Sequence, residues 1–159
     1  MPKTDFDPLD WDNLEAHQDF EKSGADYASV GTLLGPILAA PPSPHHVSFS
    51  SPISSSLLKD NVTELATFYG LSSNFTFNLG LFLNVLRQAT GFEGVSGGTV
   101  VEDLEFKGTK GKAYMIAISW KSVEDHVKAM TREDVMECLP LIGEAAEHVE
   151  MHHVKFREG

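Results

Sequence analysis

Cysteine is almost absent from this sequence of 159 residues. The single cysteine, Cys138, excludes a disulfide within the chain, which suits a reducing compartment. No run of 18 apolar residues occurs, so no membrane-spanning helix is expected. The N-terminal residues lack the apolar stretch of a signal peptide, and we therefore expect a cytoplasmic protein.

Basic residues are also scarce. Twelve lysines and arginines stand against 23 aspartates and glutamates, which gives a formal net charge of −11. Such a charge repels nucleic acid and anionic membranes, and no basic cluster offsets it. We expect neither kind of partner, and solubility alone accounts for the acidity.

Two unusual motifs occur twice in the same order. A tryptophan is followed six positions later by a histidine, first as Trp11 and His17 and then as Trp120 and His126. Each is followed by a His-His-Val-x-Phe motif, beginning at positions 45 and 152. The tryptophan precedes that motif by 34 residues in the first copy and by 32 in the second. This agreement predicts that one structural unit is present twice.

The second copy has the pattern of a complete unit. Ser122, with Asp125 three positions on, predicts a helix N-cap, and Pro140 predicts a bend. The other signals are runs of β-branched and aromatic residues and apolar residues at helical spacing. Together they predict strands at 62–69, 97–106, 113–119 and 149–156, and helices at 75–90, from 122, and over 132–147. The resulting order, βαββαβ, is the ferredoxin-like α+β arrangement, with one antiparallel sheet and its helices on one face.

The first copy has only the second half of this pattern. A helical stretch follows Trp11 to about residue 39, and a strand is predicted at 46–49. A Ser/Pro-rich linker covers residues 50–56. We therefore expect a truncated α+β half repeat with its linker at 1–56 and a complete ferredoxin-like domain at 57–159. The segment 13–49 should superpose on 122–156.

At Trp120-x5-His126, the preceding Gly-Lys-Ala-Tyr strand and the terminal His152-His153-Val154-x-Phe156, the chain resembles dimeric α+β barrel proteins. It is most similar to the fungal branch of antibiotic-biosynthesis-monooxygenase-like (ABM) domains, in which two units are often fused in tandem. The resemblance covers residues 61–159 and, as a half unit, 9–50. It implies a cofactor-independent cyclase or monooxygenase acting on a hydrophobic, aromatic or polyketide-like substrate. Heme-degrading enzymes and proteins without known activity share the same fold.

His126 is the first candidate catalytic residue. It lies on the stripe Val123, His126, Val127 and Met130, so it faces the core side of its helix. A lone imidazole there is more often structural than catalytic. An imidazole in an apolar cavity is, however, also a natural acid or base for enolisation or aldol closure.

Strand alternation selects two more candidates. His152 shares a face with Val154, whereas His153 falls on the other face and is expected to be solvated. Tyr69 and Thr67 share a face of the strand at 62–69, and the Tyr69 phenol could donate to a substrate carbonyl. The catalytic candidates are thus His126, His152 and Tyr69.

Substrate-lining candidates come from the same elements. Trp120 is either a large core residue at the barrel end, the commoner case, or a wall of an aromatic pocket. The full set expected to line the substrate is Trp120, Phe82, Met130 and Thr67. The histidines at 148, 152 and 153 straddle a helix-to-strand boundary without a fixed carboxylate or thiol, so no metal site is predicted. No organic cofactor is implied.

Three functions remain open at this point. The first is the cofactor-independent enzyme, which predicts an apolar cavity where Tyr69, His126 and His152 converge. The second is a non-catalytic ligand-binding or stress-response barrel, and the third is an inactive remnant of a tandem-repeat protein. A homodimer is also expected, because the strand at 113–118 is apolar on both faces and the half repeat is too small to cover a sheet.

Overall fold

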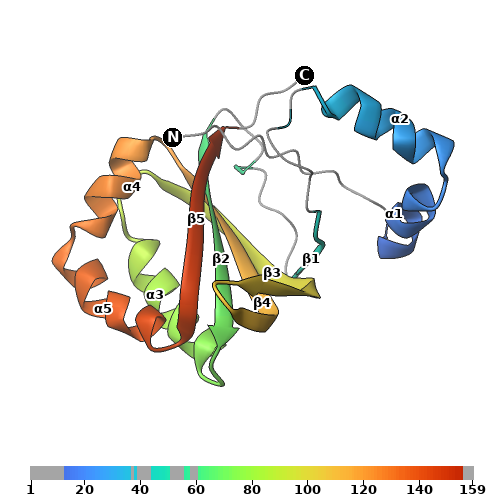
Figure 1. Ribbon diagram of the computed structural model, residues 1–159. Helices are drawn as coiled ribbons and strands as arrows, with labels where there is room; N and C mark the ends of the chain where they lie inside the picture. The colour runs from blue at the N-terminus through green and yellow to red at the C-terminus, as the bar shows by residue number, and fades with distance from the viewer. Residues whose placement is uncertain (1–12, 37, 39–43, 51–55, 58–60, 156–159) are drawn as a thin grey trace. The chain divides into compact units, whose positions relative to one another are not determined.

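The computed structural model describes residues 13–36, 38, 44–50, 56–57 and 61–155 (Figure 1). The expectations placed on Trp11 and Phe156 lie outside these residues. The described chain divides into two compact units, one ending at His46 and the other beginning at Val47. Each is taken by itself below.

The larger unit is built on a five-stranded antiparallel sheet. Its strands lie in the order β1-β3-β4-β2-β5. Their bounds are β1 Val47–Phe49, β2 Val62–Leu71, β3 Phe92–Phe106, β4 Thr109–Trp120 and β5 Ala146–Lys155. Three helices complete it: α3 Phe75–Leu86, α4 Val123–Met130 and α5 Glu133–Gly143. From β2 onward this is the predicted ferredoxin-like α+β arrangement, which is thereby confirmed.

The β3–β4 hairpin is closed by the two residues Lys107 and Gly108. Both have positive φ, 51° and 86°, as a two-residue turn matched to the strand twist requires. Phe106 pairs with Thr109 directly across this turn. The connection between the strands predicted at 97–106 and 113–119 is therefore only two residues long in the structure, and β4 begins four residues before the apolar run at 113.

The helices cover one face of the sheet, as expected (Figure 1). Apolar residues of α3 recur at helical spacing and pack against β2 and β4. The buried core consists of Ala66, Phe68, Phe75, Leu79, Phe82, Leu86, Ala89, Ile116, Ile118, Trp120, Ala129, Val135 and Ala145. Within the described chain, no helix is long and apolar enough to cross a membrane.

Strand alternation in β2 determines what each face of the sheet presents. Ala66 and Phe68 point into the helix-covered core, so Glu64 points the same way. Leu65 points to the opposite face, where it clusters with Leu57, Ala117 and Val154. The alternation of β2 therefore places the Glu64 carboxylate on the face of the sheet that the helices cover.

Strand β1 closes the outer edge of β3. Ser48 pairs with Thr99, and Phe49 pairs with Gly98. A Cβ at Gly98 would lie 2.1 Å from the backbone oxygen of Ser48, so only glycine allows this close approach. The edge of the ferredoxin-like sheet is therefore covered by a strand that precedes it in the sequence.

The smaller unit contains two short helices, α1 Leu14–Glu21 and α2 Ala25–Leu34. A single helical stretch was predicted here, and it is interrupted at Gly24, whose φ of 66° breaks the helix. The Asn13 side chain caps α1 by accepting from the Ala16 amide. Ser122 caps α4 in the same way, by accepting from the Asp125 amide, as predicted.

Candidate functional site

Trp120 ends β4 and is fully buried under the helix layer. Its indole N–H donates to Glu64 Oε2 at 2.9 Å, and its ring meets Phe92 edge-on at 5.7 Å between centroids. Because a buried indole N–H needs an acceptor, Glu64 and Trp120 fix one another in the core. This pair forms the inner end of a polar chain.

His126 lies next in that chain. It occupies the buried side of α4, with its ring 5.2 Å from the Trp120 ring. Its Nε2 is 3.3 Å from Glu64 Oε2, and its Nδ1 is 2.8 Å from Nε2 of His153. The chain Glu64–His126–His153 therefore leads from a buried carboxylate to a histidine on the exposed edge strand β5.

Burial shifts the proton affinities of all three groups. Desolvation raises the pKa of Glu64, although the hydrogen bond from Trp120 and the charge of His153 lower it. Desolvation lowers the pKa of His126. Partial burial, followed by the charge of His126, lowers the pKa of His153, while Glu64 raises it. These opposite shifts bring the pKa of the Glu64 carboxyl closer to the pKa of the His126 imidazole. A smaller difference in pKa favours proton transfer between the two groups.

Glu64, His126 and His153 also have the composition of a metal site. Each offers one ligand atom, and these atoms all lie within 4.8 Å of one another. His126 Nε2 is buried and makes no hydrogen bond within the described chain. Two imidazoles and a carboxylate are donors that divalent transition metals accept.

His153, and not His152, joins this cluster, although His153 is exposed as expected. In the sheet, His153 pairs with Glu64 and His152 pairs with Leu65. Directly paired residues share a face, so His153 lies on the helix-covered side and His152 on the other. His152 is 42% exposed there, with Nε2 3.4 Å from Glu150 Oε1.

Tyr69 and Thr67 lie on the same face as His152, away from His126. Tyr69 donates its hydroxyl to Glu150 Oε2 at 3.1 Å and stacks on Phe106 at 4.7 Å between centroids. Desolvation and the neighbouring carboxylate raise the pKa of this phenol to about 12. Tyr69 and His152 therefore do not converge with His126 in one cavity, because the sheet separates them.

The predicted lining residues are also divided between the faces. Phe82 is buried in the helix-covered core, and Met130 packs against the same core. Thr67 is buried on the opposite face. The structure thus places His126, Trp120, Phe82 and Met130 on the helix-covered side of the sheet, but not Thr67.

Sequence reasoning missed Glu64. A signal was present, since Glu64 is the one acidic residue of the strand predicted at 62–69 and alternates with Ala66 and Phe68. An acidic residue on the core side of a strand needs a buried partner. Pairing it with His153 requires the strand register, which the sequence does not specify.

A second histidine pair lies within the smaller unit. His17 Nδ1 contacts His46 Nε2, with ring centroids 4.6 Å apart. His17 Nε2 is 3.9 Å from Glu21 Oε1. The contact joins the same two ring nitrogens, Nδ1 and Nε2, as the contact between His126 and His153. In both copies the second histidine of the His-His pair makes the contact.

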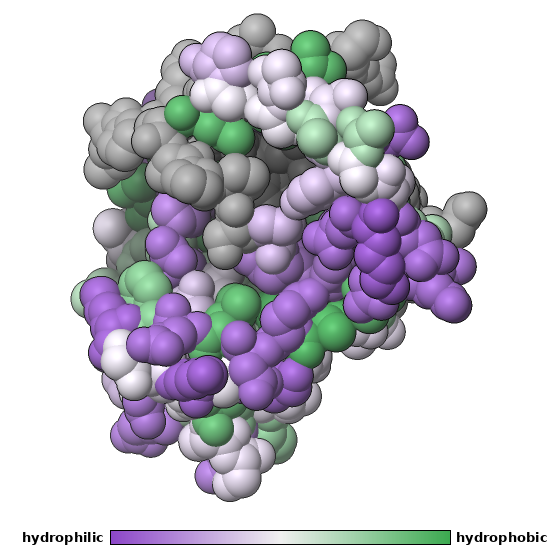
Figure 2. Space-filling view, turned by 45° about the vertical axis from the view of Figure 1, so that its right-hand side comes forward, coloured by the Kyte–Doolittle hydropathy of each residue, from purple (hydrophilic) through white to green (hydrophobic). Residues whose placement is uncertain are grey.

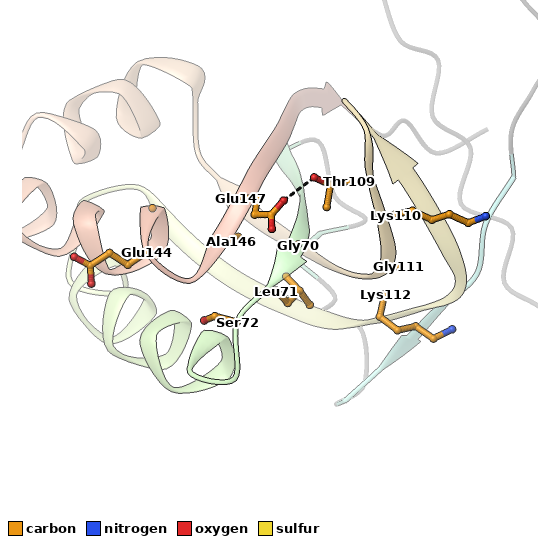
Figure 3. Close-up of a pocket in the computed structure, with 11 residues that line it drawn as sticks. Gly70, Leu71, Ser72, Thr109, Lys110, Gly111, Lys112, Glu144, Ala146 and Glu147 are labelled. Carbon is orange, nitrogen blue, oxygen red and sulfur yellow. Dashed lines mark hydrogen bonds between the residues drawn. The ribbon is translucent and has the colours of Figure 1, made fainter.

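Two pockets in the described part of the chain lie away from this cluster. A pocket of ≈ 590 Å³ opens at the far end of β2, between the β3–β4 turn and the start of β5 (Figure 3). Thr109 donates to Glu147 Oε2 across it at 2.7 Å, while Lys110 and Lys112 point away from Glu147. A shallower depression is lined by Arg132, Glu133, Asp134 and Glu137.

No model of a known protein family matches the chain. No curated protein matches it in sequence. Solved structures do resemble it, and several of these are ABM domain proteins.

Three of these structures illustrate the likeness. SnoaB, a cofactor-independent oxygenase from Streptomyces nogalater, is 14% identical, with a TM-score of 0.49 over 64% of this chain and 97% of its own. A candidate antibiotic biosynthesis monooxygenase from Bordetella bronchiseptica is 18% identical, with a TM-score of 0.48 over 63% and 100%. Another from Chloroflexus aurantiacus is 11% identical, with a TM-score of 0.45 over 62% and 94%. Each of these is a protein to which the chain is similar.

Proposed function

We propose that this protein is a small-molecule enzyme that removes a proton from a hydrophobic, aromatic or polyketide-like substrate without an organic cofactor. The observation that carries the proposal is the chain Glu64–His126–His153, which connects a buried carboxylate to an exposed imidazole. A base oriented by a second group, itself held by a third, is the usual construction of an acid–base site.

In the proposed step, the His153 imidazole takes a proton from a carbon next to a substrate carbonyl. The C–H bond breaks and its electron pair forms a carbon–carbon double bond, the π pair of the carbonyl moves onto oxygen to give the enolate, and the proton stays on the imidazole. His126 orients the His153 ring through the contact of 2.8 Å. Glu64, fixed by Trp120, stabilises positive charge that develops on the two rings.

Exchange of a substrate proton for deuterium tests this function directly. The protein is incubated in D₂O with hydroxylated polycyclic aromatic ketones, and loss of the α-proton signal is followed by NMR. We expect His153→Ala to reduce the rate by about 10²-fold or more, the range of general base catalysis. His152→Ala is the matched control and should leave the rate unchanged. Exchange that is equally fast without His153 contradicts the proposal.

A second candidate is a ligand-binding protein without catalysis. The observation in its favour is the packing against His126, where the fully buried Trp120 ring lies 5.2 Å from the His126 ring. In that case the polar chain only stabilises the helix layer. Saturable binding of the same ketones, with no proton exchange in any variant, would favour this function.

We also propose that residues 13–49 are a half repeat of the unit at 122–155, as in fungal tandem ABM-like proteins shortened at the first unit. In support, α1 and α4 both have eight residues and begin with side-chain caps of the same kind. The histidine at the fourth position of each helix contacts a histidine just before or within a strand. Solution structures of the two segments would test this, and unrelated helix directions after superposition of the histidine pairs would contradict it.

A further inference from the structure

The two imidazoles at the exposed end of the cluster present their nitrogens to each other. His126 Nδ1 and His153 Nε2 are 2.8 Å apart, and the rings are inclined by 51°. Metal–imidazole bonds are about 2.0–2.1 Å long, so two nitrogens at right angles on one ion lie about 2.9 Å apart. The observed separation therefore fits two neighbouring ligands of a single ion.

The carboxylate behind His126 completes the arrangement. A histidine that binds a metal through one nitrogen usually directs the other toward a carboxylate, which fixes the ring and raises its basicity. His126 Nε2 lies 3.3 Å from Glu64 Oε2, and the Trp120 indole N–H holds that same oxygen. Nε2 makes no hydrogen bond within the described residues, so Glu64 has no competitor there for this nitrogen.

A similar order of groups occurs at a second place in the chain. In the smaller unit, Nδ1 of His17 faces Nε2 of His46, and Nε2 of His17 is 3.9 Å from Oε1 of Glu21. The order carboxylate, Nε2, Nδ1, Nε2 is therefore repeated, although Glu21 lies on the same helix as His17, whereas Glu64 lies on a strand.

We propose that the His126–His153 pair binds a divalent transition-metal ion of the Ni²⁺ and Cu²⁺ class, whose tetragonal sites place neighbouring ligands at right angles. His126 Nδ1 and His153 Nε2 are the ligands, and Glu64 orients His126 from behind. Imidazole ligands suit these ions, His153 on the exposed edge strand gives the ion access, and the net charge of −11 attracts cations. The ion replaces the contact through which His126 orients His153, so it inhibits the exchange reaction proposed above.

Copper titration of untagged protein tests the site. The His46→Ala background removes the second pair, so one pair remains to be measured. We expect one Cu²⁺ per chain by calorimetry, with an electron paramagnetic resonance spectrum that shows coupling to two imidazole nitrogens. Adding His153→Ala should weaken binding at least tenfold and remove that coupling, whereas His152→Ala should change neither.

A Glu64→Gln variant in the same background tests the orienting role. Loss of an orienting carboxylate typically weakens metal binding by about 10- to 100-fold, while the two-nitrogen spectrum should persist. Circular dichroism confirms that each variant is folded. Binding that survives His153→Ala, or a spectrum without two imidazoles, overturns the site, and unchanged affinity in Glu64→Gln overturns the role of Glu64.

This inference does not rest on the proposed enzymatic function. A protein that exchanges substrate protons but binds no Cu²⁺ at this pair contradicts the metal site alone. A protein that binds the ion but exchanges no proton contradicts the enzymatic proposal alone.

Discussion

Tyr69 shows how burial and a neighbouring carboxylate act on a single side chain. Its hydroxyl donates to Glu150, and its pKa is raised to about 12, first by desolvation and then by Glu150. The phenol should therefore remain neutral at pH 11, where an ordinary tyrosine is mostly ionised. Ultraviolet titration of the phenolate checks this, with Tyr69→Phe identifying the late component. Ionisation of all three tyrosines near pH 10 in the folded protein would contradict it.

The same shift predicts how stability depends on pH. The pKa of Tyr69 is higher in the folded than in the unfolded chain. Its contribution to the free energy of unfolding is therefore fully present below pH 10 and is lost as pH rises toward 12. The free energy of unfolding of the wild type should fall more steeply over this range than that of Tyr69→Phe. Denaturant unfolding at several pH values measures the difference.

A residue of the candidate site could be predicted from the sequence only where its position is determined by the helix or strand to which it belongs. His126 was placed correctly on the buried side of its helix, since helical spacing alone determines that side. The partner of His126 was assigned to the wrong face, because the face of β5 that the helices cover depends on its pairing with β2. Glu64 was missed for the same reason.

At the scale of elements, the helix caps give matched predictions. Ser122 and Asn13 each accept a hydrogen bond from the amide three residues on. Ser122→Ala should lower the free energy of unfolding by about 1 kcal/mol, while Ser122→Asp should retain the stability. Asn13→Ala should speed amide exchange in α1 without affecting α4. Thermal unfolding and hydrogen exchange measure the two effects, and a neutral Ser122→Ala would contradict the role of the cap.

The contact between β1 and β3 gives a further prediction. Gly98→Ala would place a Cβ 2.1 Å from the Ser48 oxygen and should displace β1. We expect a loss of about 1–3 kcal/mol, the usual range for overpacking, and faster exchange of the Ser50 amide, which donates to Gly97. The exposed neighbour Thr99 is the control, and Thr99→Ala should stay within about 0.5 kcal/mol. Unchanged protection of Ser50 in Gly98→Ala would show that β1 adjusts.

The presence of most helices and strands could be predicted from the sequence, but the residues at which they begin and end could not. The strands at 62–69 and 113–119 were found because β-branched and aromatic residues mark them, but β4 extends back to Thr109 through Lys and Gly residues. Those residues are held by pairing with β3, and their own preferences do not specify a strand. The pairing of β1 with β3 could not be predicted either, because it joins residues about 50 positions apart in the sequence.

At the scale of the whole molecule, hydrophilic side chains are prominent at the surface. The face drawn in Figure 2 carries many of them, with smaller apolar areas between them. A net charge of −11 is expected to disfavour anionic partners. An uncharged or cationic ligand meets no such barrier.

The expected homodimer needs a different argument from the one that the sequence suggested. The strand at 113–118 was expected to present a bare apolar face, but Met115 and Ala117 on that face are already buried, at 6% and 7% exposure. What remains is the outer edge of β5, which pairs with no strand of the described chain. An unpaired edge strand is a ready partner for a second copy of itself.

We expect two copies to pair through β5 in antiparallel register about Met151, which is 44% exposed. In that register Glu147 of one copy lies opposite Lys155 of the other, which is a pair of opposite charges, and Glu150 lies opposite His152. Light scattering should give twice the mass of the chain. Lys155→Glu should weaken the dimer, Glu147→Lys added to it should restore the dimer, and Lys128→Glu on α4 should have no effect. A monomer at micromolar concentration would contradict the dimer. Like charges directly opposite each other destabilise a strand pair, so a dimer insensitive to Lys155→Glu would contradict this register.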